Sequence, residues 1–343
     1  MPALSLNTKP SATGRLTDSH GRTIHDLRVS ITDRCNYKCV YCRTGEVGAQ
    51  YPELASDDYL RLIRVFVGLG ITKIRLTGGE PLLRRGLVEL VAELARMRTA
   101  AGEPLELALT TNGHLLAGLA AQLKAAGLNR VTVSMDAVEA ATFERITRVP
   151  GSFEAVLKGI RAARSAGLEP LKINCVLLRG FNDSQIEGFA EFARREGVVV
   201  RFIEFMPLEE GRLWTPGIVV PLAEIVVRIG RVLPLVRIAP RDASETATRY
   251  TFADGLGEIG IIAPVSQAFC GACSRVRLTS DGKIRTCLFS QVEHDLYGRL
   301  RAGASDIELA AYIVRTIEGK EARHHIGESG FLKPSRSMVH IGG

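Results

Sequence analysis

The sequence predicts an α/β fold, an incomplete (βα)6 barrel of the TIM type followed by a β-rich C-terminal extension. Between residues 27 and 205, six short apolar runs rich in branched side chains alternate with longer runs of helical spacing. Unusual polar residues gather where the strand runs end, and the alternation stops after Glu210. Strand–helix alternation favours parallel strands joined by right-handed crossovers. An open doubly wound sheet would show the same alternation, so the periodicity leaves both topologies open.

The elements follow in order along the chain. The six strands are expected over residues 27–32, 73–77, 105–110, 131–135, 171–178 and 198–205. The helices are expected over residues 56–68 or 56–70, 85–98, 116–126, 153–166 and 184–196. Ser56 is a good cap for the first helix because its side chain can accept from free amides, and Asp57 and Asp58 suit the positive end of the helix dipole.

The whole chain divides into four predicted parts. Residues 1–20 are expected to be disordered, 21–210 to form the barrel, 211–330 to form the extension with a second cysteine group, and 331–343 to form a tail ending in Gly-Gly. Within the extension, 213–233 reads as a loop and a helix, and 249–262 as β hairpins.

Composition restricts the class of protein. The chain has 343 residues, of which 46% are hydrophobic and 24% charged, as in an ordinary globular protein. The formal charge of +7 indicates an anionic partner without separating a nucleotide from RNA or a membrane surface. Residues 1–20 lack the apolar core of a signal peptide, and the most apolar run, 217–236, is interrupted by prolines and charges. The protein is predicted to be cytoplasmic.

Three cysteines follow the first strand in one short loop. Cys35, Cys39 and Cys42 have the spacing C-x3-C-x2-C. Thiolates hold iron–sulfur clusters, and three of them on a four-iron cubane leave one iron open to an outside ligand. The alternatives are a zinc knuckle or plain core cysteines. Structural zinc takes four closed ligands, and no fourth Cys or His lies nearby on the C-terminal side. The sequence therefore predicts a 4Fe-4S cluster here.

A second cysteine group lies in the extension. Cys270, Cys273 and Cys287 again supply three thiols and predict a second 4Fe-4S cluster. The alternative is a zinc ribbon that lacks a ligand or is completed by His294. Arg275 and Arg277 alternate along a strand and therefore share one face beside this group. Two guanidinium groups on one face suit a multiply charged anion.

Polar residues gather at the carboxyl ends of the predicted strands, where barrel enzymes build their sites. They are Gly78, Gly79, Glu80, Thr110, Ser134, Asp136, Glu204 and Met206. Lys172 and Asn174 share one face of the fifth strand, and a charge inside an apolar strand needs a partner. An anionic ligand in the barrel mouth would supply one. Cys175, on the opposite face, is expected to be a core thiol.

Several of these motifs match a known family. Cys35, Cys39, Tyr41 and Cys42 resemble the signature of radical S-adenosylmethionine (SAM) enzymes. With the second cysteine group, residues 259–262 and residues 337–343 included, the chain resembles the molybdenum cofactor biosynthesis protein A family, whose members are GTP 3′,8-cyclases. The resemblance implies a lyase in which a 5′-deoxyadenosyl radical removes the ribose 3′ hydrogen of GTP. The product would be 3′,8-cyclo-7,8-dihydro-GTP.

The resemblance also implies site residues. The implied SAM contacts are Tyr41, Gly79, Ser134 and Met206. The implied GTP contacts are Arg28, Arg75, Thr110, Lys172, Arg275, Val276 and Arg277, with Lys73 and Arg201 as further candidates. The implied catalytic residues are Arg275, Arg277, Gly342 and Gly343. Arg201 and Met206 are five residues apart and would face opposite sides of an unbroken strand, so a bulge or a strand end must intervene if both belong to the site.

Rival functions remain. A radical SAM enzyme acting on a peptide or on tRNA would share the first cysteine group, and a non-enzymatic metal-binding scaffold could hold both groups. The cyclase interpretation implies GTP and SAM as partners, an electron donor, transfer of the product to a cyclic pyranopterin monophosphate synthase, and a possible homodimer. It implies neither a nucleic-acid partner nor a membrane partner.

Overall fold

Strands and helices alternate through the first two thirds of the chain in the computed structural model, which describes residues 15–43 and 48–342. The six strands are β1 (Asp26–Ser30), β2 (Lys73–Thr77), β3 (Glu106–Thr111), β4 (Arg130–Ser134), β5 (Lys172–Leu177) and β6 (Val199–Glu204). The helices that connect them are α1 (Ser56–Gly68), α2 (Leu87–Arg96), α3 (Leu116–Ala125), α4 (Ala140–Thr147), α5 (Ser152–Ser165) and α6 (Ile186–Glu196), with short 3-10 turns η1 (Pro81–Leu83) and η2 (Asp183–Gln185).

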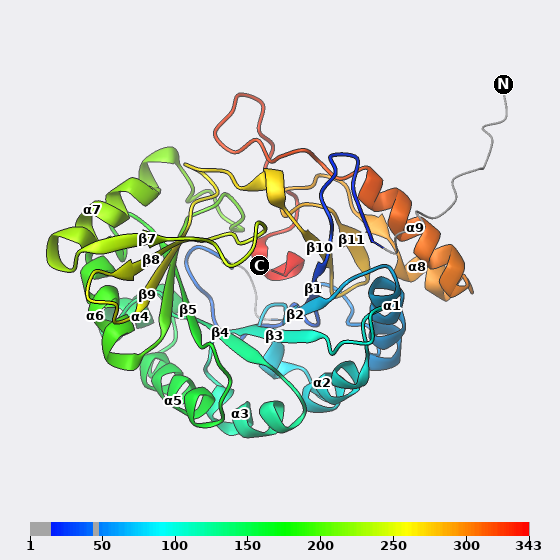
Figure 1. The fold of residues 1–343 in the computed structure, drawn as a ribbon, viewed down its shortest axis with the longest axis horizontal. Helices are drawn as coiled ribbons and strands as arrows, with labels where there is room; N and C mark the ends of the chain where they lie inside the picture. Colours follow the sequence, from blue (N-terminus) through cyan, green and yellow to red (C-terminus); the bar gives the residue numbers. More distant parts are fainter. Residues whose placement is uncertain (1–14, 44–47, 343) are drawn as a thin grey trace.

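The six strands lie side by side in chain order, and every neighbouring pair is parallel. Figure 1 shows a strongly curved sheet with helices α1 to α6 on its outer face. The α/β fold with a parallel sheet is thus confirmed. Helices on one face of a curved sheet fit a partial barrel, whereas a doubly wound sheet carries helices on both faces.

The C-terminal segment extends this same sheet at both edges. It contributes η3 (Pro216–Ile218), α7 (Leu222–Val232), β7 (Leu235–Ile238), β8 (Thr248–Phe252), β9 (Glu258–Ile262), η4 (Cys270–Ala272), β10 (Arg275–Leu278), β11 (Lys283–Arg285), β12 (His294–Asp295), α8 (Tyr297–Arg301), α9 (Asp306–Glu318) and α10 (Met338–Ile341). The predicted hairpin is present as antiparallel β8 and β9. In addition, β9 pairs in parallel with β6 and β10 pairs in parallel with β1. The strand–helix alternation of the sequence ends after β6, whereas the sheet continues beyond β6 through β9, β8 and β7.

Two expectations about the elements were wrong. Residues 15–20, expected to be disordered, belong to the fold, because Thr17 bridges Thr23, Leu16 is buried and Asp18 pairs with Arg22 at 2.5 Å. The rest of the predicted disordered segment, residues 1–14, lies outside the described residues. Helix α4 was not expected, since its 8 residues form too short a stretch for helical periodicity to stand out.

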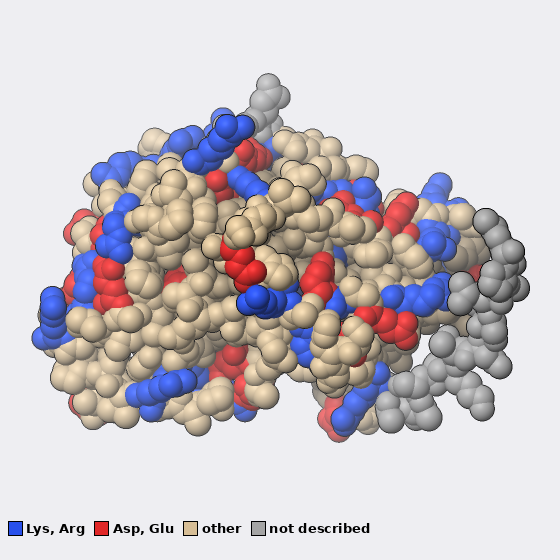
Figure 2. All heavy atoms as spheres, turned by 90° about the horizontal axis from the view of Figure 1, so that it is seen from above, with Lys and Arg blue, Asp and Glu red and all other residues tan. Residues whose placement is uncertain are grey.

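The core lies between the sheet and its outer helices, where most apolar strand residues are buried. Cys175 belongs to this core, as expected. Among the described residues, no helix combines the length and the apolar content needed to cross a bilayer. On the face shown in Figure 2, basic and acidic side chains are interspersed. The cations that bear on function lie inside the barrel.

Candidate functional site

A cavity of about 260 Å³ opens at the carboxyl ends of the strands. The first cysteine group lines it, together with Phe269, Arg275 and Leu288 from beside the second group. All four implied SAM contacts line it as well, namely Tyr41, Gly79, Ser134 and Met206. So do five implied nucleotide contacts, Arg28, Arg75, Thr110, Arg275 and Arg277. The structure therefore brings the first cysteine group, several residues beside the second group and most of the predicted site to one cavity, whereas the three thiols of the second group do not line it.

The first cysteine loop is held by the glycine turn that follows β2. The Gly79 amide donates to the Thr32 carbonyl at 2.8 Å, and the Glu80 amide donates to the Arg34 carbonyl at 2.7 Å. A Cβ at Gly79 would lie 2.3 Å from the Arg34 carbonyl oxygen, and one at Gly78, whose φ is +151°, would lie 2.2 Å from the Thr32 carbonyl oxygen. Both glycines are therefore required for the close packing of two backbones.

The substitution Gly79→Ala is accordingly expected to displace the cysteine loop and reduce iron in the first cluster severalfold. The added methyl group would overlap backbone rather than a movable side chain. Iron and sulfide analysis after anaerobic reconstitution measures the effect, and Gly48→Ala, where a Cβ meets nothing within 4 Å, is the matched control. Full cluster content in Gly79→Ala would show that the loop tolerates the shift.

The first three thiols are too buried to ionise by themselves. Burial raises the pKa of Cys35 to about 11 and that of Cys42 to about 12, and it raises the pKa of Cys39 still further. Repulsion from Asp136 and from the neighbouring sulfurs adds to the shift of the Cys39 pKa, and repulsion from Cys35 adds to that of Cys42. A bound cationic centre would reverse this effect, since coordinated thiols are deprotonated. Three half-buried thiols that line one cavity fit a four-iron cluster with one free iron.

The second group has a more cationic surrounding. Burial by itself raises the pKa of the Cys273 thiol, but Arg275 and Lys320 bring it down to about 7. Arg275 also donates to the Cys273 sulfur at 3.4 Å. Lys320 is buried and donates to the backbone carbonyls of Arg275 and Thr286, which flank two of the cysteines. These cations suit a thiolate-bound, negatively charged cluster.

The zinc alternatives can be compared with the same geometry. Within residues 15–43 and 48–342, no three His, Cys, Asp or Glu side chains converge closely enough to hold a single metal ion. His294 lies in β12 and pairs with Ile284 of β11. In each cysteine group the donors are three thiols.

The implied SAM contacts come from four different strand ends. Tyr41 donates its hydroxyl to Asp136 at 2.6 Å, and burial raises the pKa of that carboxyl to about 6. Ser134 is the last residue of β4. Met206 lies beyond β6, which ends at Glu204. Arg201 and Met206 would face opposite sides of an unbroken strand, but β6 ends between them. Both therefore line the same cavity.

A cluster of buried arginines crosses the barrel interior. Arg28 lies opposite Arg75 of β2 on one side and Arg277 of β10 on the other. Burial lowers the pKa of all three; repulsion from Arg28 adds to the shift of Arg75 and Arg277, and repulsion from Arg275 adds to that of Arg28. The Arg28 Nε has no hydrogen-bond partner among the described residues. Concentrated buried positive charge of this kind needs an anion.

Arg75 of this cluster and the nearby Arg201 both donate to Thr132, a threonine that the sequence did not single out. Arg75 donates to Thr110 at 3.1 Å and to Thr132 at 3.4 Å, while Arg201 donates to Asn174 at 3.0 Å and to Thr132 at 3.4 Å. Thr132 lies in mid-strand without a charge or a motif, so nothing in the sequence marks it.

Lys172 was expected to lie in the barrel mouth, but it does not. It is the first residue of β5 and lines a second cavity, of about 610 Å³, which adjoins the amino ends of β1 to β5. The two cavities share Arg28, Arg75, Arg201 and Arg275, so they adjoin through the arginine cluster. Burial and the charge of Arg201 lower the pKa of Lys172 to about 7. Lys73 lines the same second cavity and pairs with Asp26 at 3.3 Å.

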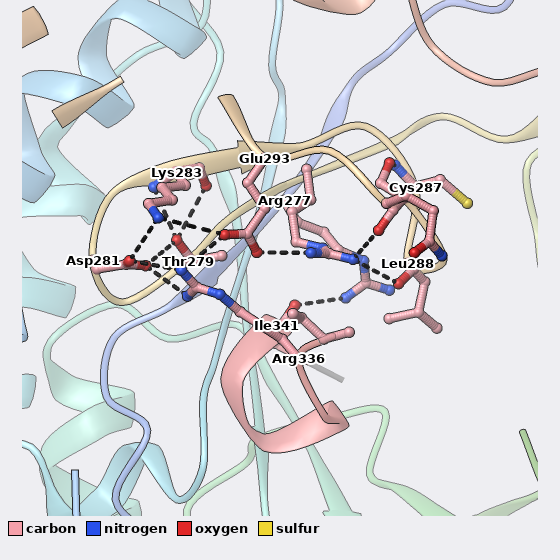
Figure 3. Close-up of polar contacts among 12 residues, drawn as sticks. Arg277, Thr279, Asp281, Lys283, Cys287, Leu288, Glu293, Arg336 and Ile341 are labelled. Carbon is pink, nitrogen blue, oxygen red and sulfur yellow. Dashed lines mark hydrogen bonds and ion pairs between the residues drawn. The ribbon is translucent and has the colours of Figure 1, made fainter. Parts of the chain in front are cut away.

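Three implied residues remain. The Val276 side chain is fully buried and lines neither cavity, so only its backbone is available to a ligand. Gly342 is buried in the barrel, and its carbonyl accepts a hydrogen bond from Arg277. Figures 1 and 3 show this end of the chain at the centre of the curved sheet and beside Arg277. Gly343 lies outside the described residues.

Comparisons with known proteins agree with this geometry. Residues 29–193 match the Radical SAM superfamily, and residues 198–326 match Molybdenum Cofactor Synthesis C. The chain is 44% identical to the GTP 3′,8-cyclase of Moorella thermoacetica, over 96% of this chain and 100% of the relative. It is 46% identical to the GTP 3′,8-cyclase of Xanthomonas axonopodis pv. citri, over 85% of this chain and 88% of the relative.

A solved structure shares the fold. Streptococcus suis SuiB bound to S-adenosylmethionine aligns with a TM-score of 0.56 and 13% identity, over 85% of this chain and 68% of that chain. At this identity the similarity concerns the fold alone.

Proposed function

The chain belongs to the GTP 3′,8-cyclase family, and we propose from this premise that it is a radical SAM lyase. It converts GTP into 3′,8-cyclo-7,8-dihydro-GTP, the first step of molybdenum cofactor biosynthesis. The observation that carries the proposal is that the first three-cysteine group, residues beside the second group and an arginine cluster all line one cavity. A nucleotide triphosphate is an anion of the size and charge that such a cluster needs.

The two cysteine groups fit two 4Fe-4S clusters. Cys35, Cys39 and Cys42 would hold the cluster that binds SAM, and Cys270, Cys273 and Cys287 would hold the cluster next to the guanine base. When bound, the first cluster supplies the electron for reductive cleavage of SAM and thus hydrogen-atom abstraction. Tyr41, Gly79, Ser134 and Met206 border the space where SAM would lie.

The protein's own part is to bind and orient the substrate. Arg28, Arg75 and Arg277 neutralise the triphosphate and fix it by charge-assisted hydrogen bonds. Thr132 and Thr110 orient the Arg75 guanidinium by accepting hydrogen bonds from it. The buried tail covers the cavity beside Arg277 and limits entry of water to the reacting nucleotide. The product passes to a cyclic pyranopterin monophosphate synthase, a separate donor supplies electrons, and a homodimer is a possible assembly.

The test incubates reduced, cluster-loaded protein with SAM and GTP under anaerobic conditions. The expected result is 5′-deoxyadenosine together with a cyclised guanosine triphosphate, detected by chromatography and mass spectrometry. Cleavage of SAM without a GTP-derived product would favour a radical SAM enzyme of another substrate class, and salt-sensitive RNA binding would indicate tRNA. Stoichiometric zinc in place of about eight irons per chain would indicate a metal-binding scaffold.

Lys172 gives a separate prediction about substrate binding. Lys172 lines the second cavity, which shares Arg28 and Arg75 with the first, so a triphosphate that extends past these arginines would reach it. Lys172→Met is therefore expected to weaken GTP binding about tenfold to a hundredfold, because a charged hydrogen bond contributes roughly 1.5–3 kcal/mol. Iron content should stay unchanged. Calorimetric titration of the cluster-loaded protein measures the loss, and Lys124→Met on the surface is the control.

The pH dependence of this interaction has a definite sign. The pKa of Lys172 is lowered to about 7, so the cationic form that binds an anion is depleted as the pH rises above 7. GTP binding should therefore weaken from pH 6 to pH 8.5 in the wild type. Lys172→Arg keeps its charge over this range and should lose this decline. An equal decline in both proteins would assign the pH dependence to another group.

A further inference from the structure

Arg336 fixes the C-terminal tail to the barrel by a two-carboxylate ion pair. Its guanidinium donates to both oxygens of Asp281, at 2.9 and 2.8 Å, and lies 2.8 Å from Glu293. The three side chains are 4%, 10% and 16% exposed. Arg336 also stacks on Tyr51, with its guanidinium carbon 3.8 Å from the ring centroid. Figure 3 shows Arg336 close to Ile341, whose carbonyl accepts a hydrogen bond from Arg277.

Glu293 connects this ion pair to the second cysteine group. One of its oxygens lies 2.8 Å from Arg336, and the other accepts from Arg285 at 2.7 Å. Arg285 is fully buried and donates onward to the carbonyls of Leu288 and Ser290, which follow Cys287. The same carboxylate thus contacts the arginine of the tail and the arginine of the cysteine loop.

The tail is also held on the side of the first cysteine group. The His340 ring packs against Tyr51 with the centroids 5.2 Å apart. The Tyr51 amide donates to Asp33 at 2.9 Å, two residues before Cys35. Between these contacts the Met338 amide donates to the Leu208 carbonyl at 2.9 Å. Residues 336–342 therefore contact segments beside both cysteine groups as well as Leu208, which follows β6.

We propose that Arg336 is a positioning residue, an ion-pair latch on Asp281 and Glu293 that sets the register of the tail and so places the Gly342 carbonyl on Arg277. Glu293, shared with Arg285, makes the position of the tail depend on the loop that carries Cys287. The importance of the latch for turnover rests on the proposed function, whereas its effect on the tail can be measured without turnover.

The experiment measures hydrogen–deuterium exchange of cluster-loaded protein in peptides covering the tail and residues 281–293. In Arg336→Met, exchange in the tail peptide should rise at least about tenfold, with the barrel strands unchanged. In Glu293→Gln, both the tail and the 281–293 peptide should exchange faster. Arg336→Lys should restore part of the protection, because it keeps the charge but loses the bidentate geometry. Arg228→Met removes a bidentate ion pair with Glu187, at 2.8 and 2.7 Å, far from the tail and serves as the matched control.

The outcomes separate the latch from the proposed function. Unchanged tail exchange in Arg336→Met would overturn the latch, even if the protein converts GTP. Faster exchange spread over the whole barrel would assign the ion pair a general structural role and would also overturn it. A wild type that protects its tail but forms no cyclised product would refute the proposed function and leave the latch standing. In a latch variant of an active enzyme, cyclised product should fall relative to 5′-deoxyadenosine while iron content is kept.

Discussion

Replacing Cys35, Cys39 and Cys42 together by alanine is expected to halve the iron content, from about eight to about four atoms per chain, and to abolish reductive cleavage of SAM. The reason is that three thiolates supply every protein ligand of the first cluster. Replacing Cys270, Cys273 and Cys287 should also halve the iron, but SAM cleavage should persist while cyclised product is lost. The two triple variants therefore separate the chemistry of the two groups.

The measurements are iron analysis, electron paramagnetic resonance of the reduced protein, and quantitation of 5′-deoxyadenosine and cyclised nucleotide. Cys175→Ala is the matched control, because this thiol lies in the core away from the cavity linings. It should keep both clusters at a modest loss of stability, on the order of 1 kcal/mol. If the first triple variant still cleaved SAM, the assignment of that group would be wrong.

Deleting Gly342 and Gly343 is expected to leave both clusters in place and to reduce cyclisation by about 10²–10³-fold, the usual effect of losing one preorganised hydrogen bond at a reacting centre. The Gly342 carbonyl accepts from the buried Arg277, so the deletion removes this contact, leaves only the one to Ile341 at 3.3 Å and reorients the guanidinium. Gly342 has φ +68°, and a Cβ there would lie 2.8 Å from the Thr77 side chain. Glycine is therefore the residue that this approach permits.

The control for the deletion lies in the same tail. Leu332 is 67% exposed, and Leu332→Ala should leave turnover unchanged. Iron content and 5′-deoxyadenosine formation in the deleted protein test whether the loss is confined to the nucleotide. Undiminished cyclisation without the two glycines would contradict a role for the tail.

Local patterns were sufficient for much of the fold and for part of the site. Each of the six predicted strands is present within two residues of its expected bounds, because apolar runs and helical spacing are short-range signals. The cysteine spacings point to clusters for the same reason, since both motifs lie within single loops or hairpins. The expected gathering of polar residues at the strand ends was right for Gly79, Ser134 and Met206, which line one cavity.

Contacts between distant segments were beyond such patterns. Lys172 was placed at the mouth because periodicity gives the face of a strand but not the depth of a residue in the barrel. The pairing of β9 with β6 and of β10 with β1 joins segments about 60 and 250 residues apart in sequence, and no local signal specifies such a partner. Arg336, Asp281 and Glu293 appear in the sequence as ordinary charged residues.

The sequence by itself determined a parallel α/β fold with two three-thiol groups, because period, spacing and donor chemistry are all local properties of the chain. Only the tertiary structure decided that residues beside the second group line the same cavity as the first group, that the arginines lie opposite one another on β10, β1 and β2, and that the tail contacts one of them. The physical reason is that burial and charge repulsion depend on neighbours in space, which are set by sheet pairing and packing rather than by order along the chain.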